Sequence, residues 1–101
     1  MESLIEEISV SINHYCKDAH ISINQLTYSY GQIPFSNPKQ LAFWIGNALN
    51  ADEKYKLQLL KSKSIIERLE LCKIICQSAS IRAYKKSRIQ SLAIFIIIVI
   101  G

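Results

Sequence analysis

The residues with reactive side chains are three cysteines and two histidines, and a metal site is the first chemistry that their spacing suggests. Cys72 and Cys76 lie one helical turn apart, so their thiols could share a metal ion with His14 or Cys16. A structural zinc normally takes a tetrahedral set of ligands, commonly grouped at C-x-x-C spacing in turns. Here the ligands would come from two helix faces with no such turn between them. We therefore expect no metal and no cofactor, and we interpret the cysteines as buried structural thiols.

Acid–base chemistry is the second candidate, because Asp18 is flanked in the sequence by His14 and His20. Nucleophilic catalysis combines a Cys or Ser with a His and an acid that orients it. His14 can share a helix face with Asp18, but the sequence contains no glycine-bearing turn for a nucleophile. A G-x-x-x-x-G-K-[ST] phosphate loop is also absent from the sequence. We expect no catalytic residues and predict that the chain is not an enzyme.

Basic residues exceed acidic ones, twelve against eight, which gives a formal net charge of +4. Much of the excess comes late, from Arg82, Lys85, Lys86 and Arg88. The simplest interpretation of this cluster is a solvated positive helix face, and a contact with phosphate or acidic lipid is the alternative. No nucleic-acid partner is expected.

Apolar residues at helical spacing predict an all-α fold, a small bundle of three to four short helices within residues 1–88. Helices are expected over 2–17, from Asn37-Pro38 to about 49, from about 50–53 to 60, and from 64 to about 77, with a polar loop at about 18–36. Asn37 is a favourable N-cap and Pro38 a favourable first helical residue. Ser64 and Glu67 have the spacing of a capping box.

The expected core is drawn from the apolar positions of these helices: Leu41, Trp44, Ile45, Leu57, Leu60, Ile66, Leu69 and Ile75. Trp44 is predicted to be the central anchor, because a large aromatic side chain covers the most core surface. Gly46 costs about 1 kcal/mol relative to Ala inside a helix, so it suggests the close approach of a neighbouring helix.

Residues 89–101 form an apolar C-terminal tail that contains the uninterrupted apolar run Leu92–Ile100. A membrane-spanning helix needs about 20 apolar residues, so this run is too short for one. Membrane binding through a tail anchor is therefore the minor interpretation. A core strand or helix, a sticky unpaired tail, and an end derived from truncation or an incomplete gene model remain open.

The compartment is inferred from the cysteines and from the first residues. An odd number of cysteines argues against a disulfide framework. Glu2, Glu6 and Glu7 give the opposite of the basic start of a signal peptide. We expect a reducing environment, cytoplasmic or nuclear.

Residues 33–77 carry an ordered series of short motifs: Ile33-Pro34, Ser36-Asn37-Pro38, Phe43-Trp44-Ile45, Leu57-Gln58-Leu59-Leu60-Lys61, Ser64 and Ile66-Glu67-Arg68-Leu69. In this order they resemble the last helices of a Lon N-terminal-type domain, in which a short helix, an acidic turn, a "QLL" helix and an "ERL" helix follow one another. The Ser-Asn-Pro opening is most similar to cereblon-type members. Residues 67–70 read Glu-Arg-Leu-Glu, which also resembles the domain in ATP-dependent Lon-type proteases.

The resemblance implies a protein-binding role. Cereblon-type proteins are substrate receptors of cullin–RING E3 ubiquitin ligases, and a helical region of theirs contacts the adaptor subunit. Their zinc-bearing domain and β-rich lobe have no counterpart among these residues, so no ligand-binding residue can be carried over. The resemblance thus implies a non-catalytic fragment that contacts the ligase adaptor subunit or the missing lobe of its own domain. The alternatives are a fragment of the substrate-recognition domain of a Lon-type protease and a small tail-anchored protein.

Overall fold

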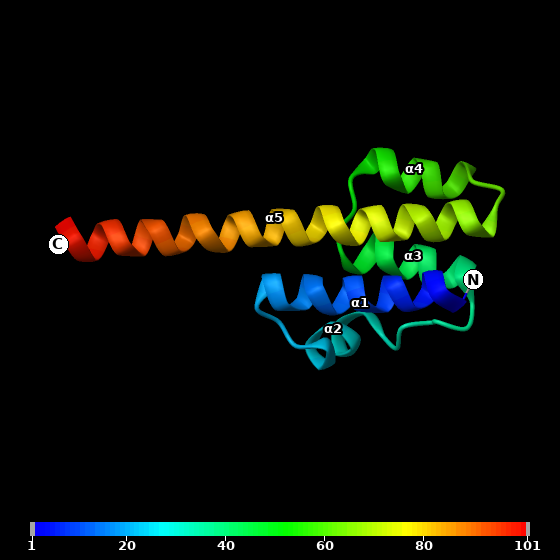
Figure 1. The fold of residues 1–101 in the computed structure, drawn as a ribbon, viewed down its shortest axis with the longest axis horizontal. Helices are drawn as coiled ribbons and strands as arrows, with labels where there is room; N and C mark the ends of the chain where they lie inside the picture. Colours follow the sequence, from blue (N-terminus) through cyan, green and yellow to red (C-terminus); the bar gives the residue numbers. More distant parts are fainter. Residues whose placement is uncertain (1, 101) are drawn as a thin grey trace.

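The computed structural model describes the backbone of residues 2–100 and the side chains of residues 3–86. In this part of the chain, five helices follow one another: α1 (Glu2–Ala19), α2 (Ile23–Tyr30), α3 (Pro38–Ala48), α4 (Glu53–Lys61) and α5 (Ile65–Ile100). The predicted all-α bundle is confirmed (Figure 1). It has one helix more than the largest predicted number, and α5 is not short, since it has 36 residues.

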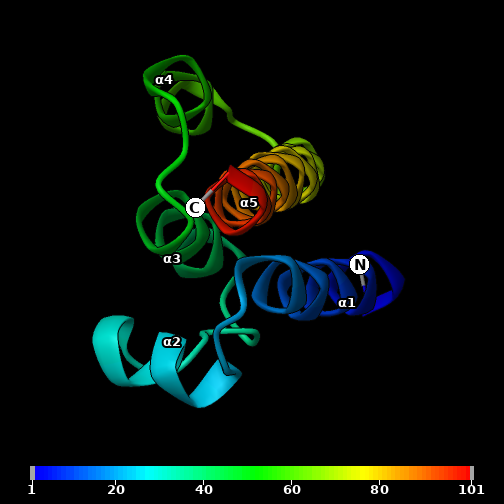
Figure 2. The ribbon, with the colours of Figure 1, turned by 90° about the vertical axis from the view of Figure 1, so that its left-hand side faces the viewer.

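The long helix α5 is the element on which the others assemble. Helices α1, α3 and α4 each pack against its first half, and α2 packs against α3. Viewed nearly along α5, the four other helices lie around it with α2 outermost (Figure 2). The second half of α5 extends beyond the other helices, which gives the molecule dimensions of 55 × 27 × 23 Å (Figure 1).

The hydrophobic core is formed mainly by α1, α3 and α5. Its largest fully buried side chains are Ile8, Ile12, Leu41, Ile45, Leu49, Leu69, Ile75, Cys72 and Cys76. Helix α1 contributes Ile8 and Ile12, which are one turn apart and therefore lie on one face. Burying side chains of this size from several helices is what holds the bundle together.

The predicted helix starts at Asn37-Pro38 and Ser64 are local features that form, and at Ser64 the structure gives the bond that the serine accepts from Glu67 in the expected capping box. The Asn37 Oδ1 accepts a hydrogen bond from the Gln40 backbone N–H at 3.2 Å, and Pro38 is the first residue of α3. Ahead of α5, the Ser64 Oγ accepts from the Glu67 N–H at 3.4 Å. In both cases a side-chain oxygen satisfies an N–H that has no partner within the helix.

Helices α1 and α3 end in the same backbone arrangement. His20 and Asn50 follow these helices in the left-handed region, with φ of 57° and 51°. In the residues that follow directly, the Ile21 N–H donates to the Cys16 carbonyl at 3.0 Å, and the Ala51 N–H donates to the Gly46 carbonyl at 3.0 Å. This is the Schellman motif, which reverses the chain and satisfies carbonyls of the last helical turn.

The predicted loop at about 18–36 is wrong in its middle, where α2 forms. The Ser22 Oγ accepts from the Gln25 N–H at 3.1 Å, and the Gln25 Oε1 accepts from the Ser22 N–H at 2.8 Å. This reciprocal capping box starts a helix of eight residues that buries only Leu26. A helix with a single buried residue shows no apolar stripe, so the periodicity of the sequence did not reveal it.

The predicted core is half right. Leu41, Ile45, Leu69 and Ile75 are buried, but Leu57, Leu60 and Ile66 are exposed by 51%, 64% and 56%. Trp44 is only partly buried and is not the central anchor. Its indole N–H instead donates to the carbonyls of Tyr30 and Gly31, at 3.1 and 3.2 Å, and so fastens the end of α2 to α3.

The apolar tail continues α5 as a helix up to Ile100, without a break at residue 88. The backbone of Leu92–Ile100 is described, but the side chains of this run lie outside the described residues. Among the residues that are described, no helix combines the length and the apolarity needed to cross a membrane.

Candidate interaction surface

The three thiols considered for metal binding are all buried in the bundle. Cys16 lies on α1, and Cys72 and Cys76 lie one turn apart on α5. Burial raises the pKa of Cys72 and of Cys76 to about 12, and it also raises the pKa of Cys16. These thiols are therefore protonated at neutral pH, a form that is a poor nucleophile and a poor metal ligand. Within the described side chains, no three His, Cys, Asp or Glu residues come together around a common point.

The candidate acid–base residues His14, Asp18 and His20 lie at the end of α1 and directly after it. The side chain of His14 is 69% exposed, and its Nδ1 lies 4.0 Å from the Asp18 Oδ2. Asp18 and His20 line an open hollow of about 490 Å³ at the ends of α1 and α3, together with Arg82 and Lys86 of α5. Cys16 lies in the core and does not line this hollow.

Arg82 organises the corner between α3, α4 and α5. Its Nη1 lies 3.4 Å from the Asp52 Oδ1, and its Nη2 donates to the carbonyls of Leu49 and Asn50 at 3.4 Å. A cation at these carbonyls complements the negative end of the α3 dipole. Asp52 precedes α4 but makes no side-chain cap bond there. Arg82 therefore has a structural role within the bundle.

The basic cluster predicted from the sequence is divided by this arrangement. Arg82, Lys85 and Lys86 are all exposed on α5, but Arg82 is paired with Asp52. The side chain of Arg88 lies outside the described residues. A solvated face is consistent with the exposure of Lys85 and Lys86, and the Arg82 guanidinium is already paired with Asp52.

Exposed apolar side chains are the most distinctive surface feature around α4 and the start of α5. Leu57 and Leu60 of α4 share the outer face of that helix, and Ile66 lies in the first turn of α5. We call Leu57, Leu60 and Ile66, three exposed side chains within ten residues of one another in the sequence, the outer apolar surface. Scattered apolar residues are normal on a protein surface, but these three belong to the motifs that were expected to fill the core.

A groove of about 250 Å³ lies beside this surface, between α3 and α4. Its walls come from both helices: Phe43, Gly46, Asn47, Lys56, Leu59 and Leu60. Sequence reasoning did not single out Phe43 or Lys56 as surface residues of one site. In the sequence, spacing is the one feature that could have indicated this groove. Positions 43 and 46–47 lie on one face of α3, and positions 56 and 59–60 lie on one face of α4.

Comparisons of the chain with protein-family models, with curated proteins and with solved structures found no match.

Proposed function

We propose that the chain is the helical part of a cereblon-like substrate receptor of a cullin–RING E3 ubiquitin ligase. In this role it binds another protein and catalyses no reaction. The sequence resemblance supports the proposal, and so does the order of the helices. Ser36-Asn37-Pro38 leads into α3, the Leu57–Lys61 motif lies on α4, and Glu67-Arg68-Leu69 lies in the first turns of α5.

The observation that carries the proposal is the exposure of the outer apolar surface. Leu57, Leu60 and Ile66 are each more than half exposed. Removing apolar area from water contributes about 25 cal/mol per Å², so a partner that covers these side chains gains binding free energy. Their position on consecutive helices gives the partner a contiguous stretch of chain to contact.

The partner that the resemblance implies is the adaptor subunit of the ligase, and the β-rich lobe of the same domain is the second partner. A stable interface of standard size buries about 800 Å² on each side.

Leu57 and Ile66 are suitable test positions because neither lines the groove between α3 and α4. An aspartate at Ile66 would also suit the positive end of the α5 dipole, so it should leave the helix intact.

The test is to mix the complete chain with the purified adaptor subunit and measure binding by size-exclusion chromatography and calorimetry. We expect a stoichiometric complex that the paired change Leu57→Asp and Ile66→Asp weakens by at least about ten-fold, because a charge would be buried at the interface. Val10→Asp is the matched control, since Val10 is 61% exposed on α1.

Circular dichroism of each variant shows whether the helices are retained. Absence of a complex with the unmodified chain would refute the role as an adaptor-binding part of a receptor. An equal loss of binding in the Val10→Asp variant would show that the outer apolar surface is not the interface.

A further inference from the structure

The second half of α5 projects beyond the rest of the molecule. Ala83 and Lys86 still line the hollow at the ends of α1 and α3, so the bundle reaches this far along α5. Beyond them the backbone continues as a helix to Ile100, and none of the other four helices lies beside it (Figure 1). The projecting half is therefore a helix that the bundle does not cover.

The positive charge of the chain is concentrated where this projection begins. Residues 71–101 contain no Asp or Glu, and they contain five basic residues: Lys73, Arg82, Lys85, Lys86 and Arg88. The whole chain has a net charge of +4, so residues 1–70 have a net charge of −1. Lys85 and Lys86 are exposed, and neither is in an ion pair with a side chain of residues 3–86. Their charges are therefore available to an anionic partner.

The stretch that follows these basic residues has the composition of a buried helix. Residues 89–100 contain no charged residue, and the nine residues Leu92–Ile100 are all apolar. Nine residues make about two and a half helical turns, so apolar positions occupy every side of the helix. A helix that is apolar all round belongs in a protein core or in a membrane. The other helices of the bundle do not reach this stretch (Figure 1), so its apolar surroundings come from outside the bundle.

The described side chains at the base of the projection are of the kinds found where a membrane meets water. Tyr84 is 55% exposed and lies on the same face of α5 as Ile81, which is 56% exposed. Tyrosine is enriched at this boundary because its ring is apolar and its hydroxyl is polar. A lysine there can lay its aliphatic stem along the apolar region and keep its ammonium group among the headgroups.

We propose that the projecting half of α5 attaches the protein to an anionic membrane surface. Residues 89–100 enter the hydrocarbon region, and Lys85, Lys86 and Arg88 lie at the level of the acidic headgroups. Twelve helical residues extend about 18 Å, and the hydrocarbon core is about 30 Å thick, so this stretch enters one leaflet and does not span the bilayer. An apolar anchor and a basic cluster together give firmer attachment than either gives alone.

A membrane suits this helix better than a second copy of the chain does. A partner helix covers one side of α5, whereas lipid covers every side of a helix that is apolar all round. The basic cluster also adds nothing to pairing between identical chains, but it is attracted to acidic lipid. The attachment goes beyond the proposed function, because it involves a different part of the molecule from the outer apolar surface.

The first measurement is binding of the complete chain to sedimented vesicles. One kind is made of phosphatidylcholine alone, and the other contains about one third phosphatidylserine. Each basic residue near an acidic surface strengthens binding by about five-fold, so we expect binding to the anionic vesicles to be at least about ten-fold stronger. This preference should shrink as the salt concentration rises, because salt screens the surface potential.

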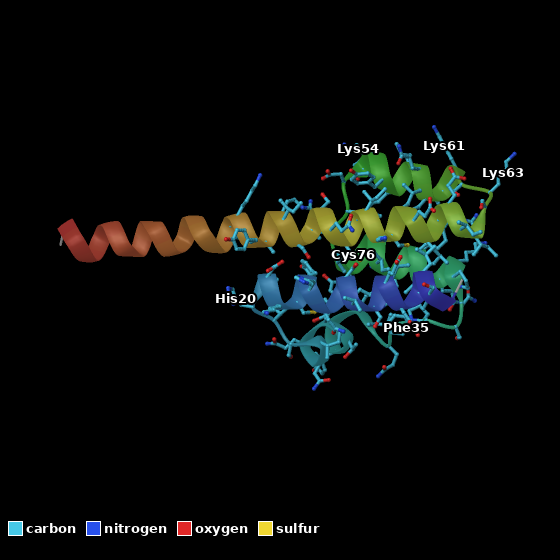
Figure 3. The ribbon with its side chains drawn as sticks, in the orientation of Figure 1. His20, Phe35, Lys54, Lys61, Lys63 and Cys76 are labelled. Atoms are coloured by element: carbon cyan, nitrogen blue, oxygen red, sulfur yellow. The ribbon has the colours of Figure 1, made fainter. Side chains whose placement is uncertain are left out.

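Two lysine pairs test the position of the charge. The paired change Lys85→Gln and Lys86→Gln should weaken binding to the anionic vesicles by at least about ten-fold. Lys61→Gln with Lys63→Gln is the matched control, because it removes the same charge from exposed lysines. These two lysines lie at the opposite end of the molecule from the projecting half (Figure 3). The control should keep the affinity of the unmodified chain.

Two further variants test entry into the hydrocarbon region. Phe95→Trp should introduce fluorescence that brominated acyl chains quench, whereas Trp44 of the unmodified chain, which lies in the bundle, should not be quenched. The paired change Ile96→Asp and Ile97→Asp should abolish binding to both kinds of vesicle, because a charge in hydrocarbon is costly. Val10→Asp on the exposed face of α1 should leave binding unchanged. Circular dichroism shows whether each variant keeps its helices.

The proposal would be overturned by absence of vesicle binding, by equal affinity for the two kinds of vesicle, or by equal effects of the two lysine pairs. A Phe95→Trp signal that lipid does not quench would also overturn it, as would burial of residues 89–100 in a dimer or against the adaptor subunit that keeps the chain off vesicles.

The outcome is separable from that of the proposed function. Leu57→Asp with Ile66→Asp should weaken adaptor binding and leave vesicle binding unchanged. Lys85→Gln with Lys86→Gln should have the opposite effects. Failure of one proposal therefore leaves the other standing.

Discussion

At the scale of single residues, burial decides what the cysteines can do. Cys72 and Cys76 have no exposed surface, and burial raises the pKa of both thiols to about 12. An ionised thiol would have to lose its hydration in an apolar core, so the neutral form is favoured. The same two residues would be reactive on an exposed helix, where a thiol ionises at about pH 8.5. Their contribution is therefore to packing.

This burial links the stability of the bundle to alkaline pH. The folded state retains the two thiol protons in a pH range where the unfolded chain has lost them. Their contribution to stability is fully present below about pH 8.5 and is lost as the pH rises toward about 12. We expect the free energy of unfolding to fall by up to about 1.4 kcal/mol per pH unit for each thiol.

Urea titrations at pH 7, 9 and 10 measure this effect. The control is the double variant Cys72→Ala and Cys76→Ala, which should be less stable at pH 7 but should lose stability less steeply above pH 9. It retains Tyr15, whose pKa burial also raises, so the tyrosine contribution is common to both proteins. If the free energy of unfolding falls equally with pH in both proteins, Cys72 and Cys76 are not the cause of the loss.

At the scale of the helices, Gly46 marks the place where α4 approaches α3. Its place inside α3 suggested the close approach of a neighbouring helix. A Cβ at Gly46 would meet only the Leu59 Cδ1, at 3.5 Å, which is an ordinary van der Waals contact. Its backbone is helical, so an alanine could adopt the same conformation without strain.

We therefore expect Gly46→Ala to raise the free energy of unfolding by about 1 kcal/mol, the difference in helix propensity. The measurement is the urea concentration at the midpoint of unfolding. The slope m, by which the free energy of unfolding falls with urea, should stay the same in the variant. Gly31→Ala is the matched control and should destabilise by about 1 kcal/mol, because Gly31 has a φ of 86° although nothing lies within 4 Å of its Cβ position. Destabilisation by Gly46→Ala would mean that α3 and α4 are packed more tightly at this point.

At the scale of the whole molecule, α5 connects the parts into one core. Leu69, Cys72, Ile75 and Cys76 of α5 are buried in the same cluster as residues of α1 and α3. A side chain on α1 therefore packs in the same core as the helix that carries Trp44, the only tryptophan in the sequence. A core shared in this way should unfold as one cooperative unit.

Truncation of Ile8 on α1 tests this cooperativity. We expect Ile8→Ala to cost about 2–5 kcal/mol, because Ile8 is fully buried and the change leaves a cavity. The unfolding midpoints from Trp44 fluorescence and from circular dichroism should move together. Val10→Ala on the exposed face of α1 should change stability by less than about 0.5 kcal/mol. Two separate transitions would show that α1 and α3 unfold independently.

Features that depend on neighbouring residues could be predicted from the sequence. Asn37-Pro38 and Ser64 start helices because a side-chain oxygen a few residues away satisfies the first backbone amides. The missed helix α2 belongs to the same class, since Ser22 and Gln25 have the spacing of a capping box that was not recognised. The all-α class followed from such signals together with the apolar periodicity.

The tertiary structure alone decided which apolar residues of α4 are buried. Leu57 and Leu59 lie on nearly opposite sides of α4, with Leu60 between them, so either face could have entered the core. The structure turns Leu59 inward beside Gly46 and leaves Leu57 and Leu60 exposed. Similarly, Arg82 meets Asp52 across 30 residues of sequence. Such choices depend on where other helices pack, and that information is not contained in local spacing.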